Sequence, residues 1–350
     1  MDSNIKHLLL KTLYYSGFIR VWSSLNKNKI TILTLHGVMD AELESEWEPL
    51  RPRTSRKLFD DTLSMAARYF DFVSLDQAIG MLKGVTPLKP NSCVVTFDDG
   101  QLNNLAVAWP ILKKHKIPVV FYPTTGALDK GEPYWFDRLD FAIQQPGLDG
   151  LEVNVGHSQI RIDQSSRQKL AGSLSKLTKS LKLKDQSDSD FQREVNGIIG
   201  DFENKSGKSI NDVTSSDLWS SPMSWDDIVQ CSMIDGITIG SHTVNHVRLP
   251  FVGKGDLASE LTESKSALEE RMKLSCIHFC YPNGDWDEHS ARVVENAGYE
   301  SAVTTDVGWN EVGDNLYTLK RYSFPVGGTA LKALFSITGI LHFMSGIRKG

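Results

Sequence analysis

The sequence has few cysteines, no uncharged run long enough to cross a bilayer and no excess of positive charge. Its four cysteines (Cys93, Cys231, Cys276 and Cys280) are too few for a disulfide scaffold and form no CxxC zinc pattern. Cys276 and Cys280 fall in one predicted strand, roughly 13 Å apart, which is too far for a bridge. We therefore expect reduced thiols and a protein in the cytoplasm or at the cytoplasmic membrane surface.

The charge balance and composition exclude further classes. Lys and Arg number 38 against 43 Asp and Glu, so no nucleic-acid partner is expected. Hydrophobic residues make up 40% and charged residues 23% of the 350 positions, as in ordinary globular proteins. Collagen-like and globally disordered chains are thereby excluded.

The two ends of the chain differ in composition from the middle. Lys11 and Arg20 interrupt the apolar N-terminal stretch, so it does not resemble a secretory signal. Residues 333–347 lack charge, but fifteen positions are fewer than the roughly 20 needed to span a bilayer. We expect helical segments at 1–29 and 326–350 that either pack on the domain or lie peripherally in a membrane interface.

Short apolar runs alternate with helical patterns between these ends. The predicted strands lie at 30–36, 72–75, 92–97, 117–122, 237–240, 276–281, 301–305 and 316–322. Most of them are continuous apolar runs rather than alternating ones, as in a parallel sheet buried on both faces. This order indicates an α/β barrel or an open doubly wound sheet. Residues 145–220, rich in Ser, Lys, Asp and Gln, are predicted to be an inserted helical lid.

Two adjacent carboxylates, Asp98 and Asp99, end the predicted strand in the sequence TFDDG. Reactive groups of barrels and open α/β sheets lie at the carboxyl ends of strands, where one carboxylate can bind a cation and the other accept a proton. The alternative is a simple turn, which Asp-Asp-Gly also favours.

Two histidines, His242 and His246, follow another predicted strand in the sequence SHTVNH. The i, i+4 spacing would let both imidazoles share one face of a helical turn and bind one metal ion. The alternative is two unrelated histidines. Together with an aspartate they would form a three-ligand site open to water and substrate, with the second aspartate as base, which favours metal-assisted hydrolysis.

TFDDG followed by SHTVNH resembles the polysaccharide deacetylases, carbohydrate esterase family 4, over about residues 30–325. The resemblance implies a distorted (β/α) barrel of about seven parallel strands with a helical insertion. It also implies metal-dependent removal of N-acetyl groups from amino sugars. Asp98 would be the general base, Asp99, His242 and His246 the metal ligands, and Thr243 a brace of the loop through hydrogen bonds.

The third family motif, Arg-x-Pro-x-Gly, falls on Cys280-Tyr281-Pro282-Asn283-Gly284. The resemblance implies that the backbone N–H of Asn283 helps to stabilise the oxyanion. We predict that the neighbouring Tyr281 contacts the substrate. The motif Arg is absent because Cys280 stands in its place. Our hypothesis is that Arg321 supplies the missing cation; the alternative is a surface arginine.

The general acid is predicted to be His36, at the end of the first strand, as in the circularly permuted exopolysaccharide-deacetylase-like branch of the family. His342, in a late Leu-x-His-like position, is the alternative. Trp135 is the leading candidate for stacking on a sugar ring, although it could equally pack a lid.

The predicted function is therefore N-deacetylation of a polysaccharide or saccharide precursor. Zn²⁺ is the expected metal, with iron, cobalt or nickel also compatible with two histidines and one aspartate. Two other functions stay open: hydrolysis of another small amide or ester, such as a lipid-linked or nucleotide sugar, and carbohydrate binding without catalysis.

Overall fold

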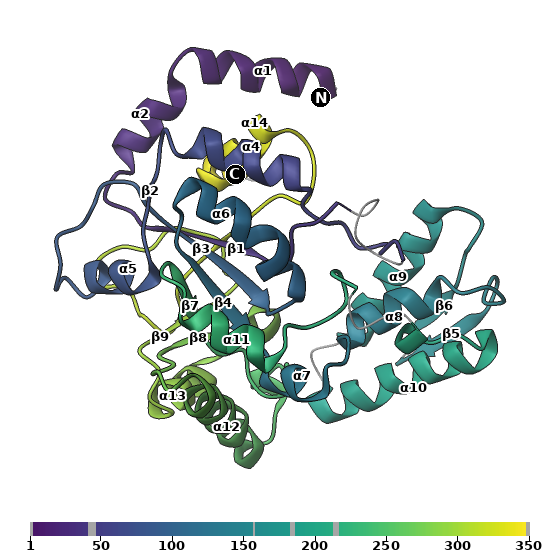
Figure 1. Cartoon of the computed structure of the whole chain (residues 1–350). Coiled ribbons are helices and arrows are strands. Elements are labelled where there is room, and N and C mark those ends of the chain that lie inside the picture. The colour runs from purple at the N-terminus through teal and green to yellow at the C-terminus, as the bar shows by residue number, and fades with distance from the viewer. Residues whose placement is uncertain (1–2, 41–46, 157, 183–185, 213–216, 348–350) are drawn as a thin grey trace.

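A computed structural model describes residues 3–40, 47–156, 158–182, 186–212 and 217–347 (Figure 1). It consists of a central set of parallel strands, helices around it, a separate lobe formed by the insertion, and helices from both chain ends that lie together.

The central strands form a nearly closed ring. One sheet has the order β10-β1-β3-β4-β7, a second pair joins β8 to β9, and all of these pairings are parallel. Single parallel bridges, Ser241 to Phe279 and Val303 to Leu319, connect the two sets. Seven parallel strands therefore surround the core, which confirms the predicted α/β class with its mostly parallel sheet. Their bounds are β1 Thr31–Leu35, β3 Ser92–Asp99, β4 Val119–Pro123, β7 Ile237–Ile239, β8 His278–Cys280, β9 Ser301–Val303 and β10 Tyr322–Ser323.

The register of these strands determines where the polar residues at their carboxyl ends lie. Leu35 pairs with Phe97, Phe97 with Phe121, and Phe121 with Ile239, so four strands share one apolar layer. Every residue of β1, β3 and β4 is buried. The residues that follow this layer in each strand emerge at the same rim of the ring.

The helices cover the outside of the ring, and four of them begin at a side-chain cap. Serine caps α4, α5 and α11, and Asp287 caps α13. The surrounding elements are α4 Arg56–Ala66, β2 Asp71–Phe72 (paired with the start of β3), α5 Leu75–Leu82, the π-helical η1 Asn104–Ala108, α6 Trp109–His115, α7 Thr125–Lys130, α11 Trp225–Ser232, α12 Lys254–Met272 and α13 Glu288–Asn296. Short 3₁₀ turns are η2 Ile210–Asp212, η3 Leu249–Phe251 and η4 Pro282–Gly284.

The insertion forms a lobe with its own hydrophobic core. It contains α8 Trp135–Ile143, the antiparallel hairpin of β5 Glu152–Val155 and β6 Ser158–Arg161, α9 Arg167–Leu181 and α10 Asp188–Ser206. Its core extends from Trp135 to Phe202, so the lobe begins about one helix earlier than residue 145. The buried pair Arg248–Asp188, 3.2 Å apart, connects it to the loop after β7.

The helices of the two chain ends pack together. These are α1 Ser3–Tyr15, α2 Phe18–Leu25, α14 Ala330–Ile337 and α15 Ile340–Ile347. The Trp22 indole donates a 2.8 Å hydrogen bond to the Thr338 carbonyl and its ring contacts Trp309 and Phe343. Within the described ranges, none of the helices combines the length and the apolar character needed to cross a membrane.

Two of the predicted strands differ from those in the structure. The run 316–322 is mostly irregular, because only Leu319 bridges to β9 before β10 begins at Tyr322. Cys276 precedes β8, so it does not share that strand with Cys280. All four cysteines are free and buried.

Candidate metal centre

The rim of the ring brings the predicted polar residues together from three strands. Asp98 and Asp99 are the last two residues of β3, His36 follows β1, and His242 follows β7 after two residues. The chain turns sharply after β3, since Asp99 and Gly100 both have positive φ values, 70° and 68°. A side chain at Gly100 would place its Cβ 2.6 Å from the Pro123 Cβ, so this turn requires glycine.

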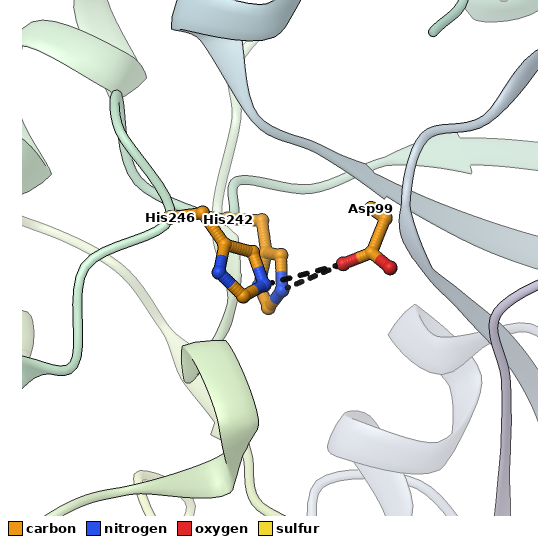
Figure 2. A group of neighbouring side chains, drawn as sticks. All are labelled: Asp99, His242 and His246. Atoms are coloured by element: carbon orange, nitrogen blue, oxygen red, sulfur yellow. Dashed lines mark ion pairs between the residues drawn. The ribbon is translucent and has the colours of Figure 1, made fainter. Parts of the chain in front are cut away.

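Asp99, His242 and His246 form one buried cluster. The Oδ1 atom of Asp99 lies 3.5 Å from Nε2 of His242 and 3.3 Å from Nε2 of His246 (Figure 2). One ligand atom from each residue lies within 4.8 Å of the other two. The predicted helical turn was wrong: residues 241–248 form an irregular loop, and Thr243 and His246 adopt left-handed conformations with φ of 69° and 55°.

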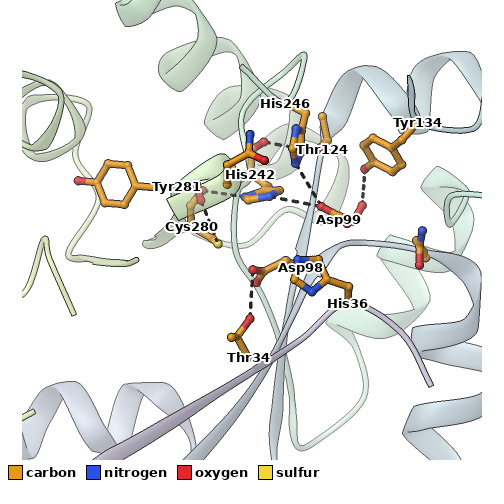
Figure 3. A network of polar contacts seen from close by, with 12 residues as sticks. Thr34, His36, Asp98, Asp99, Thr124, Tyr134, His242, His246, Cys280 and Tyr281 are labelled. Atoms are coloured by element: carbon orange, nitrogen blue, oxygen red, sulfur yellow. Dashed lines mark hydrogen bonds and ion pairs between the residues drawn. The ribbon is translucent and has the colours of Figure 1, made fainter. Parts of the chain in front are cut away.

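Hydrogen bonds orient the rings of the cluster, and its neighbours shift the pKa values of its members. Nδ1 of His242 lies 2.7 Å from the Cys280 carbonyl oxygen (Figure 3), so this nitrogen carries a proton and Nε2 is the atom that faces Asp99. Burial opposes the charged form of His242, but Cys280 and Asp99 outweigh it and raise the His242 pKa well above its usual range. Burial lowers the pKa of His246 and favours its neutral form. Burial opposes ionisation of Asp99, but the two imidazoles outweigh it and hold the Asp99 pKa well below its usual range. One carboxylate and two imidazoles fit a divalent transition metal, whose binding would displace the second proton of His242.

The second carboxylate, Asp98, is held by Arg321. The guanidinium Nη1 donates to Oδ1 at 2.7 Å and Nη2 to Oδ2 at 2.8 Å, and both side chains are buried. The Thr34 hydroxyl adds a 3.2 Å bond to Oδ2. Burial alone would raise the pKa of Asp98, but the charge and hydrogen bonds of Arg321 lower it to about 2.

Arg321 thus lies where our hypothesis required a cation, and the surface alternative is excluded because only 1% of it is exposed. Its Nη2 is 3.4 Å from the Cys280 sulfur, so the small side chain at position 280 leaves room for the guanidinium. Nε donates to the Thr304 carbonyl at 2.7 Å and Nη1 to the Thr96 hydroxyl at 3.0 Å. These bonds fix the orientation of the Arg321 guanidinium against Asp98.

A pocket of about 510 Å³ opens above the cluster and lies between the ring and the lobe. His36 and Asn283 line it beside both aspartates, and His36 is the exposed member of the group. Asn283 sits in a left-handed turn with φ of 57° and presents its side chain to the lobe. Trp135 also lines the pocket, although only 8% of it is exposed because it packs edge-on against Phe191.

Three predicted contacts differ from the structure. Tyr281 is fully buried, points away from the metal cluster and donates a 3.0 Å bond to the Tyr317 carbonyl, so it does not line the pocket (Figure 3). The Thr243 hydroxyl has no hydrogen-bond partner among the described residues, and the loop is instead held by the Thr243 carbonyl, which accepts from Thr125 N at 3.2 Å. The alternative acid His342 lies on α15 against Tyr322, outside the pocket lining.

Several residues beside the cluster were not predicted to make the contacts that they make here. The Tyr134 hydroxyl donates to the Asp99 carbonyl, and the rings of Tyr134 and Phe136 pack edge-on against His246. From the lobe, Lys182 donates a 2.5 Å hydrogen bond to Asn283 Oδ1. Arg51 reaches the buried Asp137, whose pKa is raised to about 7 because burial outweighs the arginine.

Comparison with known proteins agrees with this geometry. Residues 212–302, which include both histidines and Asn283, match the family model described as polysaccharide deacetylase. The Bacillus subtilis protein YxkH, assigned as a polysaccharide deacetylase, is 30% identical over 86 residues, which are 25% of this chain and 31% of that protein. The chain thus matches about a third of the length of this curated relative. The predicted resemblance to the polysaccharide deacetylases is confirmed.

Solved structures extend the likeness of the fold over most of the chain. The Streptococcus pyogenes deacetylase PplD, solved with acetate, has a TM-score of 0.58 at 16% identity and covers 89% of this chain and 99% of its own. BC0361, a polysaccharide deacetylase from Bacillus cereus, gives 0.53 at 16% identity, covering 89% of this chain and 69% of its own. IcaB from Ammonifex degensii gives 0.51 at 18% identity, covering 84% and 91%. The chain therefore has the fold of this family.

Proposed function

We propose that the protein is a metal-dependent deacetylase that hydrolyses N-acetyl groups of amino sugars in a saccharide. The observation that carries the proposal is the buried Asp99-His242-His246 cluster beside a second carboxylate, Asp98, that a buried arginine keeps ionised. The match of residues 212–302 to the polysaccharide deacetylase model supports the same chemistry.

Asp99, His242 and His246 would hold the metal, and Zn²⁺ suits this donor set best. When bound, a divalent cation supplies Lewis-acid polarisation of the acetyl carbonyl and of the attacking water. Removal of any ligand is therefore expected to reduce kcat rather than merely raise KM.

The remaining steps belong to the side chains of this protein. The carboxylate of Asp98 accepts a proton from the water whose oxygen bonds to the acetyl carbon. The backbone N–H of Asn283 donates to the carbonyl oxygen as negative charge develops there. His36, exposed at the pocket mouth, gives a proton to the sugar nitrogen as the C–N bond breaks, which yields acetate and a free amine.

The test is acetate release from a panel of N-acetylated oligosaccharides by metal-loaded protein, with and without a chelator. His246→Ala should lose both metal content and turnover, whereas Asp98→Asn should keep the metal and lose turnover by about 10²–10⁴-fold. Bound metal without acetate release from any member of the panel would instead support a carbohydrate-binding protein. Acetate release only from lipid-linked or nucleotide sugars would favour a hydrolase that is specific for such saccharide precursors.

We also propose that the helices of the chain ends associate with the surface of a membrane on its cytoplasmic side. Large apolar side chains are exposed there: Leu8 65%, Tyr15 82%, Val21 59%, Leu25 77% and Phe343 50%. Lys11 and Arg20 lie on the same two helices, an arrangement typical of interfacial binding.

Flotation with vesicles that contain anionic lipid tests the membrane proposal. Leu25→Asp should reduce the bound fraction, whereas Val85→Asp, at an equally exposed loop position outside these helices, should not. Protein that remains entirely unbound would refute it.

A further inference from the structure

Helix α9 of the lobe forms the wall of the pocket that faces the metal cluster. Five of its residues and Lys182, which directly follows it, line the pocket. They are spaced by three and one positions and so form one stripe: Ala171, Leu174, Ser175, Thr178, Lys179 and Lys182. The stripe gives the pocket both apolar and polar side chains and two positive charges. Asp98 and Asp99 lie in the lining of the same pocket.

The two lysines differ from the other charged residues of the pocket because no carboxylate of the described residues forms an ion pair with either. Arg51, the third cation of the lining, already pairs with Asp137 and Asp140. Asp98 is matched by Arg321, and Asp99 belongs to the metal cluster. Lys182 is partly buried, with its amine 2.5 Å from Asn283 Oδ1 and 5.6 Å from the centre of the Trp135 ring.

Lys182 has a neutral amide and an aromatic ring beside it, and the carboxylates of Asp285 and Asp99 attract it. They do not make up for the water lost on burial, because the pKa of Lys182 is still lowered. A bound anion would supply the missing charge and strong, charge-assisted hydrogen bonds. The pocket becomes still more positive when a divalent cation is held by Asp99 and the histidines. A saccharide with no charge would use neither lysine as an ion-pair partner.

We propose that Lys179 and Lys182 bind a negatively charged group, a phosphate or a carboxylate, on the N-acetylated saccharide, and so select an acidic substrate. This inference rests on the proposed deacetylase function and narrows its substrate class. It also predicts discrimination against glycans already rich in free amines, because the same two lysines repel them.

The test compares N-acetylglucosamine 1-phosphate, N-acetylmuramic acid and the neutral methyl glycoside of N-acetylglucosamine as substrates of the metal-loaded protein. The measured quantity is the ratio of kcat/KM for each acidic compound to that for the neutral one. In the double variant Lys179→Gln/Lys182→Gln this ratio should fall about tenfold, since each charge pair at a partly exposed site contributes a few-fold. The two acidic compounds distinguish phosphate from carboxylate recognition.

Lys176→Gln is the matched control. Lys176 lies on the same helix, is exposed and lines a different cavity with Asp163 and Lys169, so its loss removes one charge of the lobe without changing the pocket. The ratio should stay at the wild-type value in this variant. Because phosphate can also contact the metal directly, the comparison between variants, rather than between compounds, decides the outcome.

Each outcome separates this inference from the function on which it rests. Turnover of the neutral glycoside with a ratio that does not respond to the lysine substitutions overturns the inference and leaves the deacetylase intact. If no N-acetylated compound is hydrolysed, the proposed function fails, and calorimetric titration of N-acetylglucosamine 1-phosphate then decides the inference. The inference is supported if the double variant loses affinity for this compound while Lys176→Gln keeps it. Equal affinity in the two variants overturns the inference.

Discussion

Replacement of Arg321 by methionine should move the acid limb of the pH–rate profile upward. Asp98 has a pKa of about 2 in place of the ordinary 3.8, which corresponds to about 2.5 kcal/mol in favour of the ionised form. This is the net effect after burial has opposed ionisation, so the contribution of Arg321 itself is larger. Without the guanidinium, burial is opposed only by His36, His242 and the Thr34 hydroxyl, which contribute less than Arg321, so the Asp98 pKa should rise.

The same substitution should destabilise the fold. A carboxylate whose pKa is lowered on folding stabilises the protein above pH 3.8, and this stabilisation is lost as the pH falls toward 2. Arg321→Met leaves Asp98 buried without its partner, which costs about 3–5 kcal/mol. The double variant Arg321→Met/Asp98→Asn removes the buried charge and should regain much of the stability while remaining inactive.

The assay is kcat/KM for acetate release between pH 4 and 9, combined with urea unfolding of the same variants. Arg248→Met is the matched control, because it breaks an equally buried ion pair, with Asp188, that does not involve the base. It should lower stability without moving the acid limb. An unchanged acid limb in Arg321→Met would refute the assignment of Arg321 as the partner that keeps the base ionised.

Three further substitutions test neighbouring parts of the site. His36→Gln should keep the metal content and lower kcat by about 10²–10⁴-fold, as measured by acetate release; full turnover would exclude His36 as the acid. Asp137→Asn should flatten the dependence of stability on pH. Folding raises the pKa of the Asp137 carboxyl to about 7, so the free energy of unfolding falls as the pH rises from about 4 to 7. Urea midpoints at pH 5 and 8 measure this. Gly100→Ala should lower metal affinity by displacing the Asp99 turn, since its Cβ would lie 2.6 Å from that of Pro123; wild-type metal content would contradict the reasoning.

The parts of the site that lie at strand ends were predictable from local patterns. A continuous apolar run marks each buried strand, and parallel strands must end at one rim, so Asp98, Asp99 and His242 were expected to converge. Arg321 was predicted for a different reason. Cys280 stands where the family motif has an arginine, so Asp98 needed a positive partner from elsewhere. Arg321 lies at the end of another predicted strand and could supply it.

The features that the sequence could not give depend on contacts between distant segments. The loop that carries His242 and His246 bonds to Glu260, whose carboxylate accepts from the backbone N–H groups of Val244 and Asn245 at 2.9 Å each. These bonds replace those of a helical turn, which spacing alone had suggested. Lys182 meets Asn283 across 101 positions, and no local pattern marks such a contact.

The contact between Cys280 and Arg321 gives a last prediction about why this arrangement is stable. A guanidinium from β8 and one from Arg321 could not both lie beside Asp98, because the Cys280 sulfur already lies 3.4 Å from Nη2 of Arg321. Cys280→Arg alone should therefore lower the free energy of unfolding by about 3 kcal/mol or more, since it places a second, unpaired cation in a filled and buried site. Adding Arg321→Ser makes room and leaves a single cation for the single base, so the double variant should regain stability and part of the activity. Urea unfolding and acetate release of both variants measure this, and a single variant as stable as the wild type would show that the two positions do not compete for the same space.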